Sequence, residues 1–156
     1  MSDWMDDPRL ARTINAFALE FAIRYMREAA SLFGDDYDCA MIFLAILEVN
    51  GRQNVREPYF RQDYADVRQS IPAELAQPIS RKAISESLGM SRETVRRKIS
   101  ALIEQGYLVE DDRGGVITAR GVIANDDFLA AQGRILGYFR QLRADLRRYV
   151  TGKEDP

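Results

Sequence analysis

The sequence predicts a mainly α-helical fold that includes one small β-hairpin. The first observation is that five segments carry apolar residues at helical spacing: residues 8–34, 38–50, 80–88, 91–105 and 125–150. The second is a turn-forming run, Asp111–Gly115, between two short segments that alternate as strands do. The third is an apolar share of 46% in 156 residues, which is ample for one hydrophobic core.

The first two helices are predicted to differ in their surfaces. Asp7 and Pro8 suit the start of a helix over residues 8–34, with the acid as cap and the proline in the first turn. Its apolar stripe predicts packing along most of its length. A second helix is capped by Asp38 and closed by Gly51. This helix is apolar nearly all round, so we expect it to be buried.

Two short helices joined by a glycine turn are predicted over residues 80–105. Ser80 can cap the first of them, and Ser91 can cap the second, which covers residues 91–105. Gly89 supplies the turn, because glycine takes a positive φ without a steric cost.

A β-hairpin is predicted directly after the second short helix. Residues 107–110 and 116–118 alternate as strands around residues 111–115, which hold the acids and glycines that hairpin turns need. Two helices, a turn and a hairpin in this order are the outline of a winged helix-turn-helix, a module that reads DNA. We place this domain at residues 38–121, with an insertion at 51–78.

The insertion at residues 51–78 is less regular than the rest. It holds three prolines and equal numbers of acids and bases, and a short helix around Phe60–Gln69 is one expectation. Connections of this length without structure are unusual, so we expect the segment to pack on something. A packed spacer is favoured over an effector or partner surface, and both interpretations stay open.

Positive charge is concentrated near the two short helices. The chain has a net charge of −2, and residues 1–50 hold nine acids against four bases. Residues 80–100 hold six bases against two acids. A local positive face of this kind suits a module that presents one side to phosphates.

The start of the second short helix resembles the recognition helix of the Crp/Fnr family of regulators. The residues that carry the resemblance are Arg92-Glu93-Thr94-Val95-x-Arg97, preceded by packing residues at the usual places; Ser85 departs from the usual alanine. The resemblance implies that Arg92, Glu93 and Arg97 read bases of double-stranded DNA. Arginine can fork onto guanine, and glutamate can accept from cytosine.

Contacts to the DNA backbone are expected from basic and hydroxyl side chains around that helix. Basic side chains pair with phosphates, and hydroxyl groups at a helix N-terminus can bind them. The wing-tip arginine could enter the minor groove or meet the backbone. The backbone-binding set is Arg81, Lys82, Ser91, Thr94, Arg96, Lys98 and Arg113.

The last predicted helix, residues 125–150, carries an apolar stripe with a seven-residue repeat. The stripe consists of Phe128, Gln132, Ile135, Phe139, Leu142, Leu146 and Tyr149. A single winged domain is too small to cover both this stripe and that of residues 8–34, although packing of the stripe on its own domain is the alternative. Two long amphipathic helices flanking a winged domain resemble the MarR family, whose terminal helices interlock into a dimer. The resemblance implies a homodimer on a near-palindromic site, and the insertion at 51–78 departs from that family's pattern.

Several kinds of chemistry lack the residues they need. The chain contains no histidine, one cysteine (Cys39) and no glycine-rich phosphate loop. The acids Asp35, Asp36 and Asp38 precede a buried helix, where the helix dipole favours them as an N-terminal cap rather than as metal ligands. We therefore expect no catalytic activity, no cofactor and no tightly bound metal.

The N-terminus is acidic and lacks the apolar core of a signal peptide, and no apolar run reaches membrane-spanning length. These features and the lone cysteine favour a cytoplasmic protein without membrane contact. Two alternatives to a DNA-binding regulator remain. One is a winged-helix protein-interaction module that binds no nucleic acid. The other is a sensor of a small-molecule effector, with its pocket between the flanking helices and the winged core.

Overall fold

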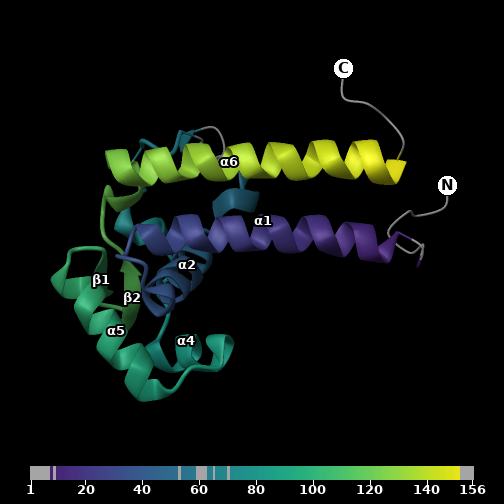
Figure 1. Ribbon diagram of the computed structural model, residues 1–156. Coiled ribbons are helices and arrows are strands. Elements are labelled where there is room, and N and C mark those ends of the chain that lie inside the picture. The colour runs from purple at the N-terminus through teal and green to yellow at the C-terminus, as the bar shows by residue number, and fades with distance from the viewer. Residues whose placement is uncertain are drawn as a thin grey trace.

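A winged helix-turn-helix body and a pair of long helices make up the structure, a computed structural model that describes residues 8, 10–52, 54–58, 63–64, 66–69 and 71–151. The long helices are α1 (Ala11–Ser31) and α6 (Asp126–Leu146). They lie side by side, run in opposite directions and extend well beyond the body (Figure 1). We call this projecting pair the arm. The predicted fold class, mainly α with a small wing, is confirmed.

The central helix of the body is α2 (Tyr37–Gly51). Ile42, Phe43 and Ile46 of this helix are almost completely buried, as its all-round apolar sequence predicts. The predicted cap was wrong by two residues. The carboxylate of Asp36, rather than that of Asp38, accepts a hydrogen bond from the backbone N–H of Cys39 at 3.0 Å. The expected cap of the first helix, Asp7, lies outside the described residues.

The two short helices form as predicted. In α4 (Arg81–Leu88) the hydroxyl of Ser80 accepts from the N–H of Ala83 at 3.1 Å. In α5 (Arg92–Glu104) the hydroxyl of Ser91 accepts from the N–H of Thr94 at 3.0 Å. Gly89 between the helices has a φ of 65°, the left-handed conformation that favours glycine.

The wing consists of β1 (Leu108–Asp111) and β2 (Gly115–Thr118), which pair in antiparallel register. The hairpin is anchored to the segment before α4, because Ile79 and Val116 exchange backbone hydrogen bonds of 3.2 and 2.9 Å. Gly115 is required by this close approach. A Cβ atom there would lie 2.8 Å from the Cβ of Pro78.

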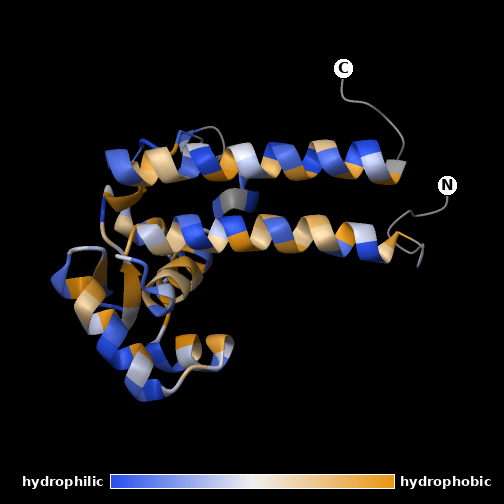
Figure 2. Cartoon of the chain, in the orientation of Figure 1, coloured by the Kyte–Doolittle hydropathy of each residue, from blue (hydrophilic) through white to orange (hydrophobic). Residues whose placement is uncertain are grey.

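The hydrophobic core joins the body to the base of the arm. Four aromatic rings meet there, with centroid separations between 5.0 and 6.3 Å: Phe33, Phe43, Tyr107 and Phe128. These rings come from the turn after α1, from α2, from the residue before β1 and from α6. The hydropathy colouring in Figure 2 shows apolar residues facing this junction, with polar residues on the outer side of α5. The core therefore fixes the arm to the reading module.

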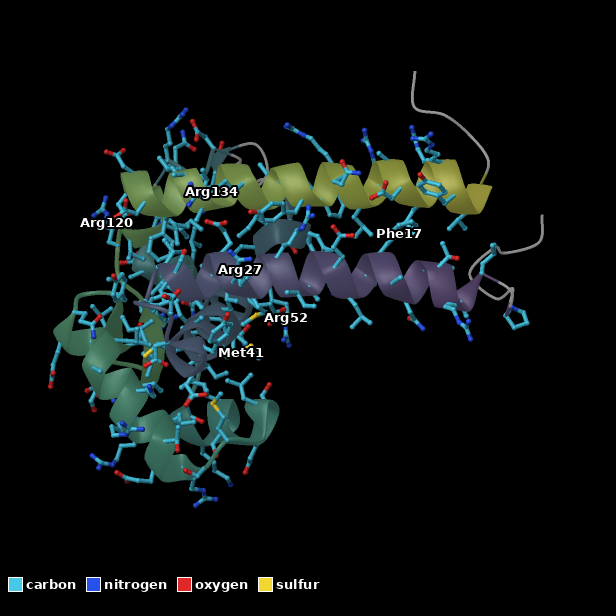
Figure 3. The ribbon with its side chains drawn as sticks, in the orientation of Figure 1. Phe17, Arg27, Met41, Arg52, Arg120 and Arg134 are labelled. Atoms are coloured by element: carbon cyan, nitrogen blue, oxygen red, sulfur yellow. The ribbon has the colours of Figure 1, made fainter. Side chains whose placement is uncertain are left out.

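Along the arm, α1 and α6 pack on each other within one chain. The rings of Phe17 and Tyr149 lie 5.6 Å apart, and Phe17 sits between the two helices (Figure 3). Near the base, the carboxylate of Glu28 accepts from Arg134 at 2.5 Å and from the hydroxyl of Tyr138 at 3.1 Å. The predicted stripe of the last helix thus packs in part on its own chain. The helix continues as a π-helical turn, Arg147–Thr151.

The insertion contains two short 3₁₀ helices, Asn54–Arg56 and Ala73–Leu75. The helix expected over Phe60–Gln69 falls partly on residues outside the described ranges. Of its described residues, 63 is helical, 64 is a bend, and 66–69 form a turn and bends. The buried amide of Asn50 joins three parts of the body. It donates to the carbonyl of Gln77 at 2.7 Å and accepts from the N–H of Thr118 at 2.9 Å.

Candidate nucleic-acid interface

The helix α5 has one buried face and one exposed face. Val95, Ile99 and Leu102 have no exposed surface and anchor the helix on the core. The side chains of Arg92 and Arg97 lie on the exposed face. The 3.6-residue period of the helix produces this division, so the same residues that fix its position also fix which side chains face solvent.

Arg92 and Arg97 make no ion pair with any other residue that the structure describes. An exposed guanidinium keeps its five donors available to a ligand. Two unpaired arginines on the first turns of an exposed helix are the donors that a guanine edge or a phosphate requires.

Glu93 and Arg96 are paired with each other. Two hydrogen bonds of 2.9 and 2.7 Å join the guanidinium to the carboxylate. The hydrogen bond and the charge of Arg96 lower the pKa of Glu93. Both side chains are more than 60% exposed, so solvent screens the pair and its contribution to stability is small. DNA could separate the two groups at little cost.

At the N-terminus of α5, the hydroxyl groups of Ser91 and Thr94 lie 2.8 Å apart. Beside them, α4 contributes two bases that already have acidic neighbours. Arg81 pairs with Glu110 of the wing at 2.6 Å, and Lys82 lies 3.8 Å from an oxygen of Glu86. These contacts are exposed, and they leave both cations near the surface.

Lys98 differs from the other bases of α5. Its side chain is only 15% exposed and forms an ion pair with Asp36, the carboxylate that caps α2. The hydrogen bond from Lys98 lowers the pKa of Asp36. Lys98 follows Arg97 in the sequence, but its side chain turns away from the exposed face of α5. It binds Asp36, which lies 62 residues earlier in the chain. Its expected role as a phosphate contact is therefore not supported by its position.

Arg113 lies in the turn of the wing, as expected, but its guanidinium is bound within the chain. Its guanidinium donates to both oxygens of Asp111 at 2.7 and 2.8 Å, and to the carbonyls of Ala73 and Ala76 at 3.0 and 2.9 Å. These bonds tie the wing tip to the insertion. We call this set of contacts the strap. The side chain expected to reach DNA thus holds the insertion on the wing instead.

Sequence reasoning missed Asn50, which holds the wing, and the pairing of Asp36 with Lys98, which positions α5. Asp36 is one of three acids before α2, and no local signal distinguishes it from its neighbours. Asn50 ends an apolar helix and is 6% exposed. A polar residue in an otherwise apolar helix was the signal that could have identified it, because buried amides need hydrogen-bond partners.

Residues 46–121 match the Crp-like helix-turn-helix domain family. The match runs from the second half of α2 through the insertion, α4, α5 and the wing, so it covers all the expected DNA contacts. No curated protein and no solved structure matches the chain. Within the described residues, no helix is both long and apolar enough to cross a membrane.

The family match agrees with the resemblance that the start of α5 carries. It does not confirm the MarR-like order of the elements, which stays a prediction. The matched family is one of DNA-binding regulators, not of enzymes. Residues 46–121 thus resemble a Crp-like helix-turn-helix domain, and this match supports a DNA-binding transcription regulator.

Proposed function

We propose that the protein is a homodimeric transcription regulator that reads a near-palindromic DNA site with one α5 helix in each half-site. The observation that carries the proposal is the exposed start of α5, where Arg92 and Arg97 make no ion pair or side-chain hydrogen bond with another described residue. The buried face of the same helix holds them in a fixed orientation. A helix presented in this way fits the major groove of B-form DNA.

The base readers in this proposal are Arg92, Glu93 and Arg97. The two arginines bind guanine O6 and N7. Glu93 accepts a hydrogen bond from a cytosine amino group once Arg96 has turned from its carboxylate to a phosphate. This exchange is favourable because the pair is exposed and therefore weak.

The backbone contacts in this proposal come from the N-terminal ends of α4 and α5. Arg81, Lys82 and Arg96 supply positive charge, and Ser91 and Thr94 supply hydroxyl groups at a helix N-terminus. Lys98 and Arg113 are left out of the backbone set. The first orients α5 through Asp36, and the second secures the wing.

The dimer in this proposal forms through the arm. Five large apolar side chains of the arm are more than half exposed: Leu19, Ile23, Leu136, Phe139 and Tyr149. Phe139 and Tyr149 stay partly open although their rings contact Phe21 and Phe17 of α1. A projecting helix pair with this exposed apolar surface can pack on a second copy as a four-helix bundle.

Binding to DNA is tested by fluorescence anisotropy with a duplex selected from a random pool and with an unselected duplex. Arg97→Ala should lose about 1–3 kcal/mol of affinity for the selected duplex, the scale of one bidentate contact, and much less for the unselected one. Arg12→Ala is the matched control, since this exposed arginine lies in the first turn of α1, and Figure 1 shows that end of α1 far from α5.

An unchanged ratio of the two affinities in Arg97→Ala would refute the role of Arg97 as a reader. A salt titration of the wild type distinguishes this function from a protein-interaction module. Phosphate binding gives a steep fall in affinity with salt, whereas a module that binds no nucleic acid gives no anisotropy change at low salt.

A further inference from the structure

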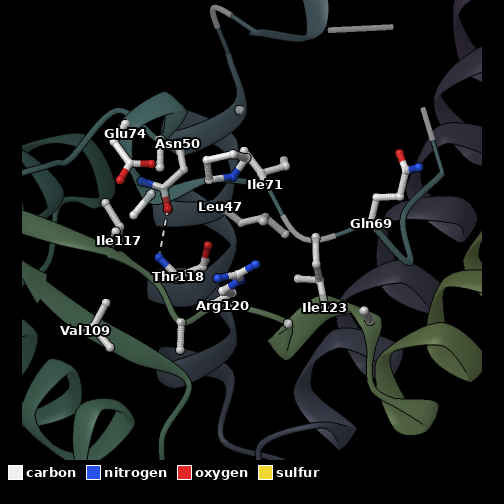
Figure 4. Close-up of a pocket in the computed structure, with 17 residues that line it drawn as sticks. Leu47, Asn50, Gln69, Ile71, Glu74, Val109, Ile117, Thr118, Arg120 and Ile123 are labelled. Carbon is white, nitrogen blue, oxygen red and sulfur yellow. Dashed lines mark hydrogen bonds between the residues drawn. The ribbon is translucent and has the colours of Figure 1, made fainter. Parts of the chain in front are cut away.

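A cavity of about 380 Å³ lies between the insertion, the end of α2 and the wing. This volume is within the range of small-molecule sites. Its apolar walls come from different parts of the chain: Leu47 of α2, Ile71 of the insertion, Ile117 of the wing and Ile123 of the link to α6. Figure 4 shows these side chains around the space, with Asn50 held to Thr118 at its edge.

Among the described residues that line the cavity, the charged ones are Arg120 and Glu74. The guanidinium of Arg120 lies among the lining side chains, while Glu74 lies beside Asn50, away from Arg120 (Figure 4). Arg120 makes no ion pair with the residues that the structure describes. Glu74 lies close enough to the strap to contribute, after Asp111, to the raised pKa of Arg113. Arg120 is therefore the positive group at the cavity that can pair with an anion, while the carboxylate of Glu74 lies apart from it.

The cavity is held in shape by hydrogen bonds on two sides. On one side, Asn50 joins α2 to the segment before α4 and to the wing. On the other, Arg113 binds the carbonyls of Ala73 and Ala76, which also line the cavity. The walls are thus fixed before any ligand binds, which reduces the entropy that a ligand must lose.

From these features we infer that the cavity is a binding site for a small monocarboxylic acid with a hydrocarbon body. The hydrocarbon part lies among Leu47, Ile71, Ile117 and Ile123, and the carboxylate pairs with Arg120. An apolar site with one charged group that orients the ligand is the usual design of such pockets. Glu74 disfavours a second acidic group. This site goes beyond the proposed DNA function and does not depend on it.

The inference is tested on the full chain by ¹H–¹⁵N NMR titration, without DNA, using cyclohexanecarboxylate as the probe. The acid should cause saturable shifts of the Ile71, Ile117 and Thr118 amide signals. Its neutral amide, cyclohexanecarboxamide, should bind about tenfold more weakly or worse, the effect of losing a charge-assisted hydrogen bond. Acetate, which lacks the hydrocarbon body, should give no saturable shift at these signals.

The variant Arg120→Gln should reduce the affinity for the acid to that for the amide. Because Arg120 is exposed, this substitution removes the charge without changing the core. Arg12→Gln, at the far end of α1, is the matched control and should leave the affinity unchanged. Saturable shifts confined to other parts of the protein, no shift at all, or an unchanged affinity in Arg120→Gln would overturn the inference. Loss of DNA binding without loss of these shifts would refute only the proposed DNA function.

Discussion

The proposed dimer can be tested through one exposed residue of the arm, Ile23. Its side chain is 62% exposed, as is that of Leu19 one turn earlier. Burying an isoleucine side chain completely is worth about 1.5–3 kcal/mol, so burying the exposed part is worth roughly 1–2 kcal/mol. Ile23→Lys changes both copies in a symmetric dimer. The expected loss is about 2–4 kcal/mol, or roughly 30- to 1,000-fold in the dimer dissociation constant.

The assay is sedimentation velocity at protein concentrations from about 1 to about 100 μM. A dimer held by an interface of standard size is expected to form in this range. The wild type should sediment as a dimer in the micromolar range, and Ile23→Lys as a monomer with an unchanged far-ultraviolet CD spectrum. Leu75→Lys is the matched control. It places the same charge on another exposed leucine, 42% exposed, which lies in the insertion and not on the arm.

A wild-type protein that stays monomeric at the highest concentration would refute the dimer and its near-palindromic site. A dimer that Ile23→Lys does not weaken would show that the outer side of α1 is not the interface. Leu142 is a poorer test site, because it lies with Phe17 and Phe21 between α1 and α6 of one chain. A charge there would disturb the arm itself.

Two further predictions concern stability. Gly115→Ala should lower the free energy of unfolding by about 1–3 kcal/mol in urea denaturation, because the new Cβ would lie 2.8 Å from that of Pro78. Gly133→Ala, with nothing within 4 Å, should have no such cost, and equal effects of the two substitutions would contradict this account. The hydrogen bond from Lys98 lowers the pKa of Asp36 in the folded protein. The pair therefore stabilises the fold at pH values above the pKa that this carboxyl has in the unfolded chain. The stabilisation is lost as the pH falls through the lower pKa of the folded protein. Asp36→Asn should therefore show a smaller fall in Tm than the wild type between about pH 6 and about pH 2, and parallel curves would count against the pair.

The sequence predicted local structure well where one residue decides it. Ser80 and Ser91 cap their helices as expected, and Gly89 takes the left-handed conformation. A serine cap bonds to an N–H three residues away, so the signal is contained in a few positions. The cap of α2 was wrong because Asp36 and Asp38 both stand before the helix, and their order gives no reason to prefer one.

The sequence did not predict the contacts of long side chains that can choose between distant partners within the chain. Arg92 and Arg97 lie on the exposed face, as the helical period requires. Lys98 and Arg113 instead bind groups far away in the chain, Asp36 and the carbonyls of the insertion. Propensity and periodicity describe faces of single elements, and they carry no information on which loop packs beside them.

The pairing of α1 with α6 has a consequence for folding during synthesis. The residues joined by the Glu28–Arg134 bond are 106 positions apart. At a ribosomal rate of about 5–20 residues per second, α1 emerges roughly 5–20 seconds before its partner exists. The elements of the body from α2 to the wing contact one another over shorter separations and can fold in that interval. A nascent chain that stops before Asp126 has no α6 to cover the apolar side of α1, and this helix is then the segment that chaperones or other nascent chains would bind first.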